Sequence, residues 1–185
     1  MIDRKIVWND AASGGLVLGG VSIAYMLCAM LLGKIHGGTA ASVIVNVSSV
    51  LLWLFKFILC IRLMKFFLQK FAIKHEDVTN QDTFRLGTSI ALLSALLYSG
   101  FYLAWVLFVQ PDMFKDSIDL ALGSYEGTFS AMQMEAVEEM IPKLPAVTFF
   151  VNFFWCWLFG IFLSAIFSRN IPPRNPFANN DSDFE

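Results

Sequence analysis

Four long stretches of the chain contain no Asp, Glu, Lys or Arg. They lie between Asp10 and Lys34, Lys34 and Lys56, Arg85 and Asp112, and Lys143 and Arg169, and they are 23, 21, 26 and 25 residues long. A helix or strand exposed to water needs a polar face, so charge-free stretches of this length indicate segments surrounded by lipid. Their Leu and Phe residues do not alternate strictly with polar residues, which excludes the strands of a membrane β-barrel. The pattern predicts an all-α polytopic membrane protein.

Four membrane-spanning helices account for these stretches. A helix crosses a hydrocarbon core of about 30 Å in about 20 residues, and residues 11–32, 86–109 and 145–167 fit the first, third and fourth spans. The second span is assigned to residues 41–63, because Gly37 and Gly38 interrupt its start and the helix must continue past Lys56 to reach sufficient length. We therefore expect one four-helix membrane domain over residues 1–170, with a flexible cytoplasmic tail over residues 171–185.

The first span has a competing interpretation as a secretory signal peptide, because Arg4 and Lys5 give the chain a positively charged start. The apolar segment that follows is longer than a signal peptide requires, and no A-x-A cleavage pattern comes after it. A membrane span is the preferred interpretation.

Overall composition agrees with a membrane protein. Hydrophobic residues make up 57% of the chain, and the mean hydropathy is +0.62. These values exclude a water-soluble enzyme domain and a disordered chain. The net charge of −2 argues against nucleic-acid binding.

The distribution of Lys and Arg predicts the orientation. Nine of them lie at the two termini or in the second loop: Arg4, Lys5, Arg62, Lys65, Lys70, Lys74, Arg85, Arg169 and Arg174. Only Lys34, Lys115 and Lys143 lie in the first and third loops. The positive-inside rule then places both termini in the cytoplasm of a bacterial inner membrane and the third loop, residues 110–144, outside.

This third loop is acidic and too long for a simple connection. Apolar residues at helical spacing predict two short amphipathic helices in it, one around residues 114–125 and one around residues 137–144. The pair is interpreted either as a solvated cap on the bundle or as a lid that faces a partner or substrate.

The second span is expected to continue as a basic amphipathic helix. Arg62, Lys65, Lys70 and Lys74 flank an apolar face formed by Leu63, Phe66, Phe67 and Phe71. Such a helix suits an anionic lipid surface, with the phenylalanines inserted among the headgroups; ordinary positive-inside anchoring is the alternative. In the turn that follows, Asp82 or Thr83 is expected to cap the third helix.

Small residues recur every four positions in two spans. Gly15 and Gly19 follow this spacing in the first span, and Gly87, Ala91 and Ala95 follow it in the third. Small residues let membrane helices approach closely. We expect these positions to mark helix contacts within one chain rather than a homodimer interface.

Lys56 is the only ionisable residue expected inside a span, apart from tyrosines and cysteines. Intramembrane charges are costly and suggest function. At 100° per residue, Asn46, Ser49 and Trp53 share a helical face with Lys56, and the other spans offer Tyr98, Tyr102 and Asn152. We call these seven residues the polar stripe. Lys56 is expected to extend its ammonium to the interface, to bind an anionic lipid headgroup, or to contact carbonyls or a tyrosine.

The sequence of the spans offers no further residues for proton transfer or metal binding. The spans contain no Asp, Glu or His, which removes the usual proton relays and cation sites. His36 and His75 belong to loops on opposite sides, and Cys28, Cys60 and Cys156 form no metal-binding pattern. We predict no catalytic residues, no metal and no cofactor.

Several stretches resemble a known family. They are 9–16 (NDAASGGL), 77–85 (DVTNQDTFR), 98–102 (YSGFY) and 164–172 (SAIFSRNIP). Together they resemble DUF4199, a family of bacterial four-span membrane proteins of unknown function typical of the Bacteroidetes. The resemblance implies an inner-membrane protein and transfers no catalytic residues. Genes of such proteins often lie near a polyprenol-phosphate-type glycosyltransferase, which implies work on envelope glycolipids by association only.

These observations lead to three functional hypotheses. The first is a non-enzymatic accessory or scaffold in envelope or glycolipid assembly, with a membrane glycosyltransferase or another envelope protein as partner. The second is a binder or transporter of an anionic lipid that uses Lys56 and the polar stripe. The third, a membrane enzyme, is disfavoured because no base–nucleophile pair can be assembled.

Overall fold

The computed structural model describes residues 4–33, 39–75, 78–123, 136–137 and 139–171. Its elements are α1 (Arg4–Gly33), α2 (Thr39–Lys74), α3 (Asn80–Phe108), α4 (Met113–Gly123), a short 3-10 helix η1 (Ile141–Lys143) and α6 (Leu144–Ser168). Helices α1, α2, α3 and α6 are long and apolar enough to cross a membrane. The prediction of an all-α polytopic membrane protein is confirmed.

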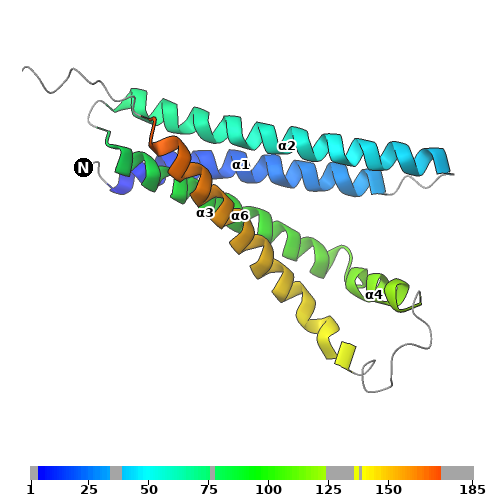
Figure 1. Ribbon diagram of the computed structural model, residues 1–185. Coiled ribbons are helices and arrows are strands. Elements are labelled where there is room, and N and C mark those ends of the chain that lie inside the picture. Colours follow the sequence, from blue (N-terminus) through cyan, green and yellow to red (C-terminus); the bar gives the residue numbers. More distant parts are fainter. Residues whose placement is uncertain (1–3, 34–38, 76–77, 124–135, 138, 172–185) are drawn as a thin grey trace, which may run out of the picture.

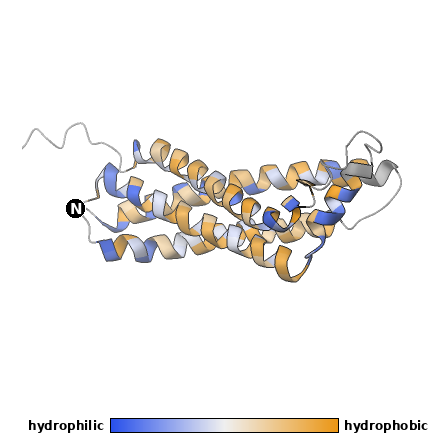
Figure 2. Ribbon diagram, turned by 90° about the horizontal axis from the view of Figure 1, so that it is seen from below, coloured by the Kyte–Doolittle hydropathy of each residue, from blue (hydrophilic) through white to orange (hydrophobic). Residues whose placement is uncertain are grey.

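The four long helices run alternately up and down, so Arg4 and Ser168 lie at the same end of the molecule (Figure 1). Figure 2 shows hydrophobic residues along the middle of the helices and hydrophilic residues towards both ends. We call the end that carries Lys70, Lys74, Arg85 and Arg169 the basic end, and the opposite end the α4 end. Helix α3 packs along both α1 and α6, whereas α2 lies mainly beside α1.

Helix α2 is packed into the bundle only near the basic end. Its buried side chains are Met64, Leu68 and Phe71, which are at most 2% exposed. They form a core with Leu86 and Ile90 of α3, together with residues of α1. No residue of α2 between positions 43 and 63 is buried. As a result, α1 and α2 diverge from α3 and α6 towards the α4 end (Figure 1).

The predicted basic continuation of the second span is part of the same uninterrupted helix, α2. The expectation that its phenylalanines enter the lipid is wrong for Phe71, which is 2% exposed in the protein core, whereas Phe66 is 54% exposed. Lys74 at the end of α2 binds the carboxylate of Asp10 on α1, with Nζ–O distances of 3.2 and 3.3 Å.

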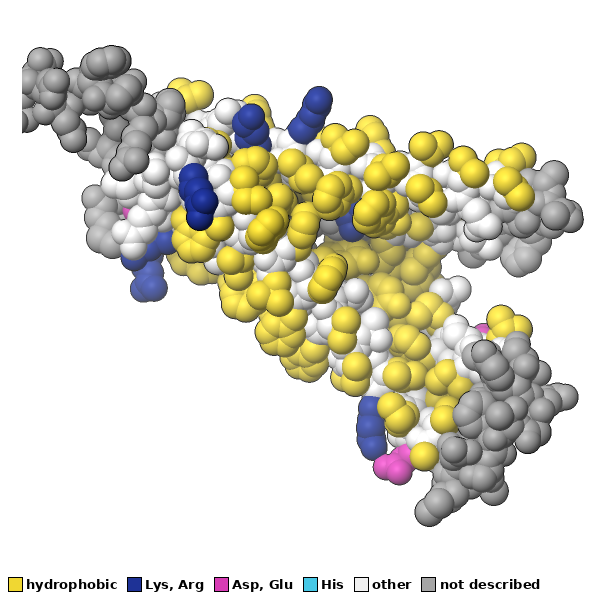
Figure 3. Space-filling view, viewed as in Figure 1, with side chains coloured by type: hydrophobic (Ala, Val, Ile, Leu, Met, Phe, Trp, Pro, Cys, Tyr) yellow, Lys and Arg dark blue, Asp and Glu magenta, His cyan; other side chains and the backbone are white. Residues whose placement is uncertain are grey.

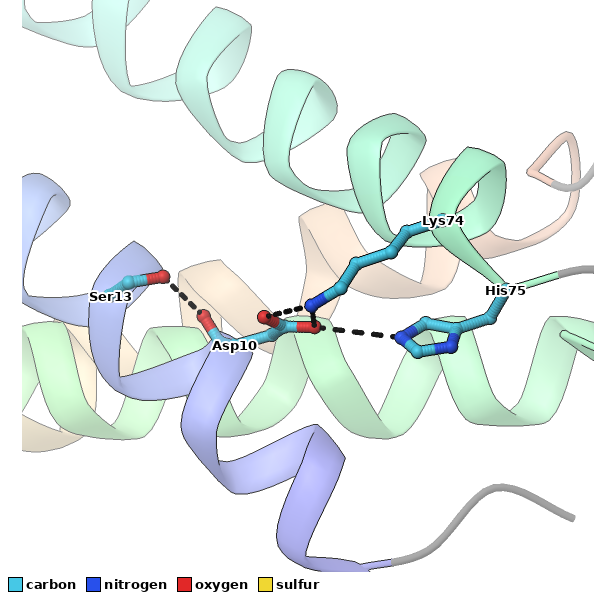
Figure 4. Close-up of polar contacts among 4 residues, drawn as sticks. All are labelled: Asp10, Ser13, Lys74 and His75. Carbon is cyan, nitrogen blue, oxygen red and sulfur yellow. Dashed lines mark hydrogen bonds and ion pairs between the residues drawn. The ribbon is translucent and has the colours of Figure 1, made fainter.

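A small polar group surrounds Asp10 at the basic end (Figure 4). The imidazole Nε2 of His75 lies 3.8 Å from Oδ2 of Asp10, one of the two oxygens that Lys74 contacts. The hydroxyl of Ser13 donates to the carbonyl oxygen of Asp10 at 2.9 Å. These contacts tie the start of α1 to the end of α2. Lys74 therefore has a carboxylate partner within the protein.

Helix α3 begins with a capping box. The hydroxyl of Thr79 accepts a hydrogen bond from the backbone N–H of Asp82, and the Asp82 carboxylate accepts one from the Thr79 N–H. This arrangement satisfies two backbone donors at the helix start. The prediction that Asp82 or Thr83 is the cap was wrong: the cap is Thr79, and Asp82 occupies the third helical position.

The third loop contains helix α4, within the region where the first amphipathic helix was expected. Of the second expected helix, around residues 137–144, only residue 138 lies outside the described ranges. Residues 136, 137, 139 and 140 are helical, and η1 (Ile141–Lys143) follows them directly before α6. At the chain end, Ile171 is 5% exposed and belongs to the core, so the tail does not begin at this residue. Residues 172–185 lie outside the described part of the chain.

The two sets of small residues lie at two different helix contacts. A Cβ atom added to Gly15 would lie 2.6 Å from Leu93 Cβ, and one added to Gly19 would lie 3.0 Å from Leu97 Cβ, so these glycines allow α1 to approach α3. On another face of α3, Gly87 contacts Ser164 and Ala91 contacts Gly160 of α6. The two ridges therefore do not face each other.

Candidate functional site

Lys56 lies half-buried near the middle of α2, on the side that faces the bundle. Its Nζ atom is 4.9 Å from the ring centre of Tyr25 on α1 and 5.1 Å from that of Tyr98 on α3. Two aromatic rings from different helices therefore face one ammonium group. The expected contact of Lys56 with a tyrosine is present in this structure, whereas extension to the interface and binding of a lipid headgroup stay predictions.

The position of these rings places the ammonium near the middle of the apolar length of α3. Tyr98 lies thirteen residues after Arg85 and twelve residues before Gln110. At about 1.5 Å per residue, these separations are about 20 Å and about 18 Å along α3. Since these two lengths together exceed the thickness of a hydrocarbon core of about 30 Å, a membrane crossed by α3 would have the ammonium near its middle.

A cation at this position is stabilised by the two tyrosine rings. Placing Lys at the centre of a membrane helix costs about 2.5–3.5 kcal/mol on the insertion scale, and each cation–π contact returns about 0.5–2 kcal/mol. Within the described ranges, no carboxylate forms an ion pair with Lys56. Two cation–π contacts together return about 1–4 kcal/mol, which is comparable with this cost, but neither ring supplies a negative charge to neutralise the ammonium.

A cavity of about 280 Å³ adjoins Lys56 and is bounded by all four long helices. Its walls are mainly apolar and aromatic, with hydroxyl groups from Ser22, Ser94 and Tyr98 and thiols from Cys60 and Cys156. The remaining lining residues are Leu18, Trp53, Phe57, Met64, Ala91, Ala95, Trp155, Phe159, Gly160 and Leu163. Figure 3 shows the surface hollowed between the diverging helices, with mostly hydrophobic walls.

Aromatic side chains of α2 and α6 meet at one side of this cavity. Trp53 stacks on Phe57 with ring centres 5.5 Å apart, and Phe57 contacts Phe159 at the same distance. Trp53 and Trp155 are 51% and 75% exposed. These two side chains therefore line the cavity and also reach the surface of the protein.

The structure brings together part of the polar stripe. Lys56, Trp53 and Tyr98 line the cavity, whereas Asn46, Ser49, Tyr102 and Asn152 do not. These four occupy the same helical faces closer to the α4 end, since Asn152 lies one turn beyond Cys156 and Tyr102 one turn beyond Tyr98. The hydroxyl of Ser49 donates to the Val45 carbonyl at 2.8 Å.

Sequence reasoning missed the contribution of α1. Ser22 and Tyr25 lie three residues apart on the face of α1 that adjoins the cavity and Lys56. The spacing of Ser22 and Tyr25 was a weak signal in the sequence that the two share a helical face. Because the neighbouring residues of the segment are apolar, this spacing did not show that the face points into the protein.

The fold and the site together define a polytopic membrane protein with a lysine that lies beside a central cavity and forms no ion pair with any carboxylate of the described residues. A family comparison matches residues 14–169 to the DUF4199 family, described as a protein of unknown function. The match covers well over half of the chain, so the protein belongs to this family. No curated protein and no solved structure matches the chain.

Proposed function

We propose that this protein binds the anionic headgroup of a membrane lipid, with the ammonium of Lys56 as counter-ion. The observation that carries the proposal is the position of this ammonium: it lies about 20 Å from the basic end, beside a cavity, without a carboxylate partner among the described residues. An anion held there would neutralise the charge in a medium of low dielectric constant, where ionic contacts are strong.

The chemistry of the cavity favours a ligand with one negative charge. Lys56 is the only cationic side chain in the cavity wall, and nearby hydroxyls of Ser22, Ser94 and Tyr98 are available as hydrogen-bond donors. A phosphodiester or a carboxylate needs one cation and a few donors. A phosphomonoester with two charges would leave one charge without a partner.

The size of the cavity favours a headgroup rather than a whole lipid. A volume of about 280 Å³ lies at the lower end of small-molecule sites, and it is far too small for two acyl chains. The exposed faces of Trp53 and Trp155 lie where the chains would continue into the surrounding bilayer.

Native mass spectrometry of delipidated protein tests this proposal. The protein is exposed in turn to phosphatidylglycerol, oleate, neutral phosphatidylcholine and inorganic phosphate, and the bound fraction is measured. We expect one molecule of phosphatidylglycerol or oleate to be retained in preference to phosphatidylcholine. A charge-assisted contact is worth about 1.5–3 kcal/mol, so Lys56→Met should reduce retention at least about tenfold.

A matched control distinguishes lipid binding at Lys56 from a general attraction of anionic lipids to basic side chains. Lys65 lies on the same helix and is exposed, so Lys65→Met should retain the anionic lipid as the native protein does. Circular dichroism and size-exclusion chromatography show whether both variants fold. Equal retention of phosphatidylcholine, or unchanged retention by folded Lys56→Met, would refute the proposal; retention of inorganic phosphate alone would refute its lipid part.

We also propose that the protein resides in a bacterial inner membrane with its basic end in the cytoplasm. The excess of Lys and Arg at this end supports the orientation, and Arg62, Lys65 and Lys70 would then meet the anionic inner leaflet. A reporter enzyme that functions only outside the cytoplasm should therefore be active when it is fused at Gly123. A role as accessory to an envelope glycosyltransferase stays a prediction, which a pull-down in mild detergent would test.

A further inference from the structure

We infer that the anionic headgroup reaches Lys56 by lateral movement from the membrane leaflet at the α4 end, through the opening between α2 and α6. This inference rests on the proposed function and adds the direction of access. Three features of the structure support it: a packed core between the cavity and the basic end, an open α4 end, and the placement of the polar side chains between them.

Tightly packed side chains separate the Lys56 cavity from the basic end, where a second cavity of about 310 Å³ lies beside Asp10, Lys70 and Lys74. Met64, Leu68 and Phe71 of α2 fill the space against Leu86 and Ile90 of α3, and all five are at most 2% exposed. The contact between Asp10 and Lys74 further ties α1 to α2 at this end. A headgroup arriving from here would have to pass through the core.

The other half of α2 leaves room for a ligand. Between positions 43 and 63 none of its residues is buried, and α2 diverges from α6 in the same direction (Figure 1). The space-filling view shows the surface hollow continuing between these helices (Figure 3). Because α2 and α6 are not joined by a loop at this end, the hollow is open to lipid on its side.

Exposed or half-buried polar side chains continue from the cavity towards the α4 end, whereas Ser164, the next hydroxyl towards the basic end on α6, is fully buried against Gly87. Ser49 and Asn46 follow Lys56 along α2, Asn152 follows Cys156 along α6, and Tyr102 follows Tyr98 along α3, each on the face that adjoins the cavity. They offer hydroxyl and amide groups to a headgroup that moves through hydrocarbon, where unpaired polar groups are costly. In the opposite direction the cavity face of α2 passes through Cys60 to the buried Met64.

The charges at the α4 end favour a lipid over a soluble anion. Helix α4 and the turn before it carry Asp112, Asp116 and Asp119, all exposed. These carboxylates repel anions that approach from water, whereas a lipid already within the leaflet moves sideways below them. The ligand is therefore expected to come from the membrane.

Leaflet-specific photolabelling tests the direction of access. A short-chain phosphatidylglycerol with a diazirine in its headgroup is added to the outside of right-side-out and inverted membrane vesicles, and cross-linked peptides are identified by mass spectrometry. The Gly123 reporter assigns the orientation. We expect peptides of the cavity wall to be labelled at least tenfold faster when the lipid enters the leaflet at the α4 end.

A pair of variants on α6 tests the opening itself. Asn152→Phe places a large side chain on the face that adjoins the cavity and should slow labelling from the α4 leaflet. Val151→Phe is the control, because Val151 is 61% exposed and lies about 100° from Asn152 around the helix axis, so its replacement should leave the labelling rate unchanged. Similar slowing by both variants would overturn the assigned opening.

The outcomes distinguish the direction of access from the lipid-binding proposal. Equal or faster labelling from the basic leaflet, with retention of phosphatidylglycerol still dependent on Lys56, would overturn the direction and leave the proposed function intact. Undiminished labelling of Lys56→Met, or absence of labelling from both leaflets, would overturn the proposed function and this inference with it.

Discussion

The contact between Gly160 and Ala91 allows a sharp test of how α3 and α6 pack. Both residues are buried, and a Cβ atom added to Gly160 would overlap the methyl group of Ala91. We expect Gly160→Ala to force the two helices apart. Gly100, on α3, has no neighbouring atom within 4 Å of the same added Cβ, so Gly100→Ala is the matched control.

The expected change in the free energy of unfolding follows from two opposing effects. Replacing Gly by Ala within a helix is favourable by about 1 kcal/mol where space allows. Overpacking a close contact costs about 1–3 kcal/mol, and at Gly160 the obstacle is the Cβ of Ala91, which is fixed to the backbone and cannot rotate away. We therefore expect Gly160→Ala to reduce the free energy of unfolding, while Gly100→Ala leaves it unchanged or raises it.

The free energy of unfolding is measured by titration with sodium dodecyl sulfate from mild detergent micelles, with circular dichroism as readout. The double variant Gly160→Ala with Ala91→Gly moves the methyl group from α3 to α6 and removes the overlap. It should recover most of the lost stability, because one methyl group again separates the helices.

Two results would refute this reasoning. If Gly160→Ala is as stable as Gly100→Ala, α3 and α6 do not approach as closely as the structure shows. If Ala91→Gly fails to restore the stability of Gly160→Ala, the loss does not arise from the contact between these two residues.

Three further substitutions test polar contacts by the same unfolding measurement. Thr79→Ala removes the capping box with Asp82 and should lower stability by about 1 kcal/mol; an unchanged midpoint would show that the box does not hold the start of α3. Asp10→Asn removes the ion pair with Lys74, whose side chain is 55% exposed, so the loss should be below about 1 kcal/mol and should vanish in high salt. Lys143→Gln breaks a more exposed pair, in which the two side chains are 65% and 78% exposed, and should leave the midpoint unchanged; a clear shift would contradict its assignment as a surface contact.

The sequence determined the number of spans and their approximate limits. Membrane helices need about 20 apolar residues, and the charge-free stretches fall within or almost within the observed helices, with residue 109 lying just past the end of α3. The capping residue was less predictable, because Thr79, Asp82 and Thr83 are all suitable caps. Only the backbone conformation shows that the helix begins after Thr79.

The sequence by itself also singled out Lys56, because one charge in a long apolar segment stands out regardless of packing. It did not determine what surrounds this residue. Lipid-facing and protein-facing side chains are both apolar in a membrane protein, so periodicity did not show that Tyr25 faces inward or that Phe71 is buried. Only the tertiary structure, which fixes the rotation of each helix about its axis, decided that four helices meet around the ammonium of Lys56.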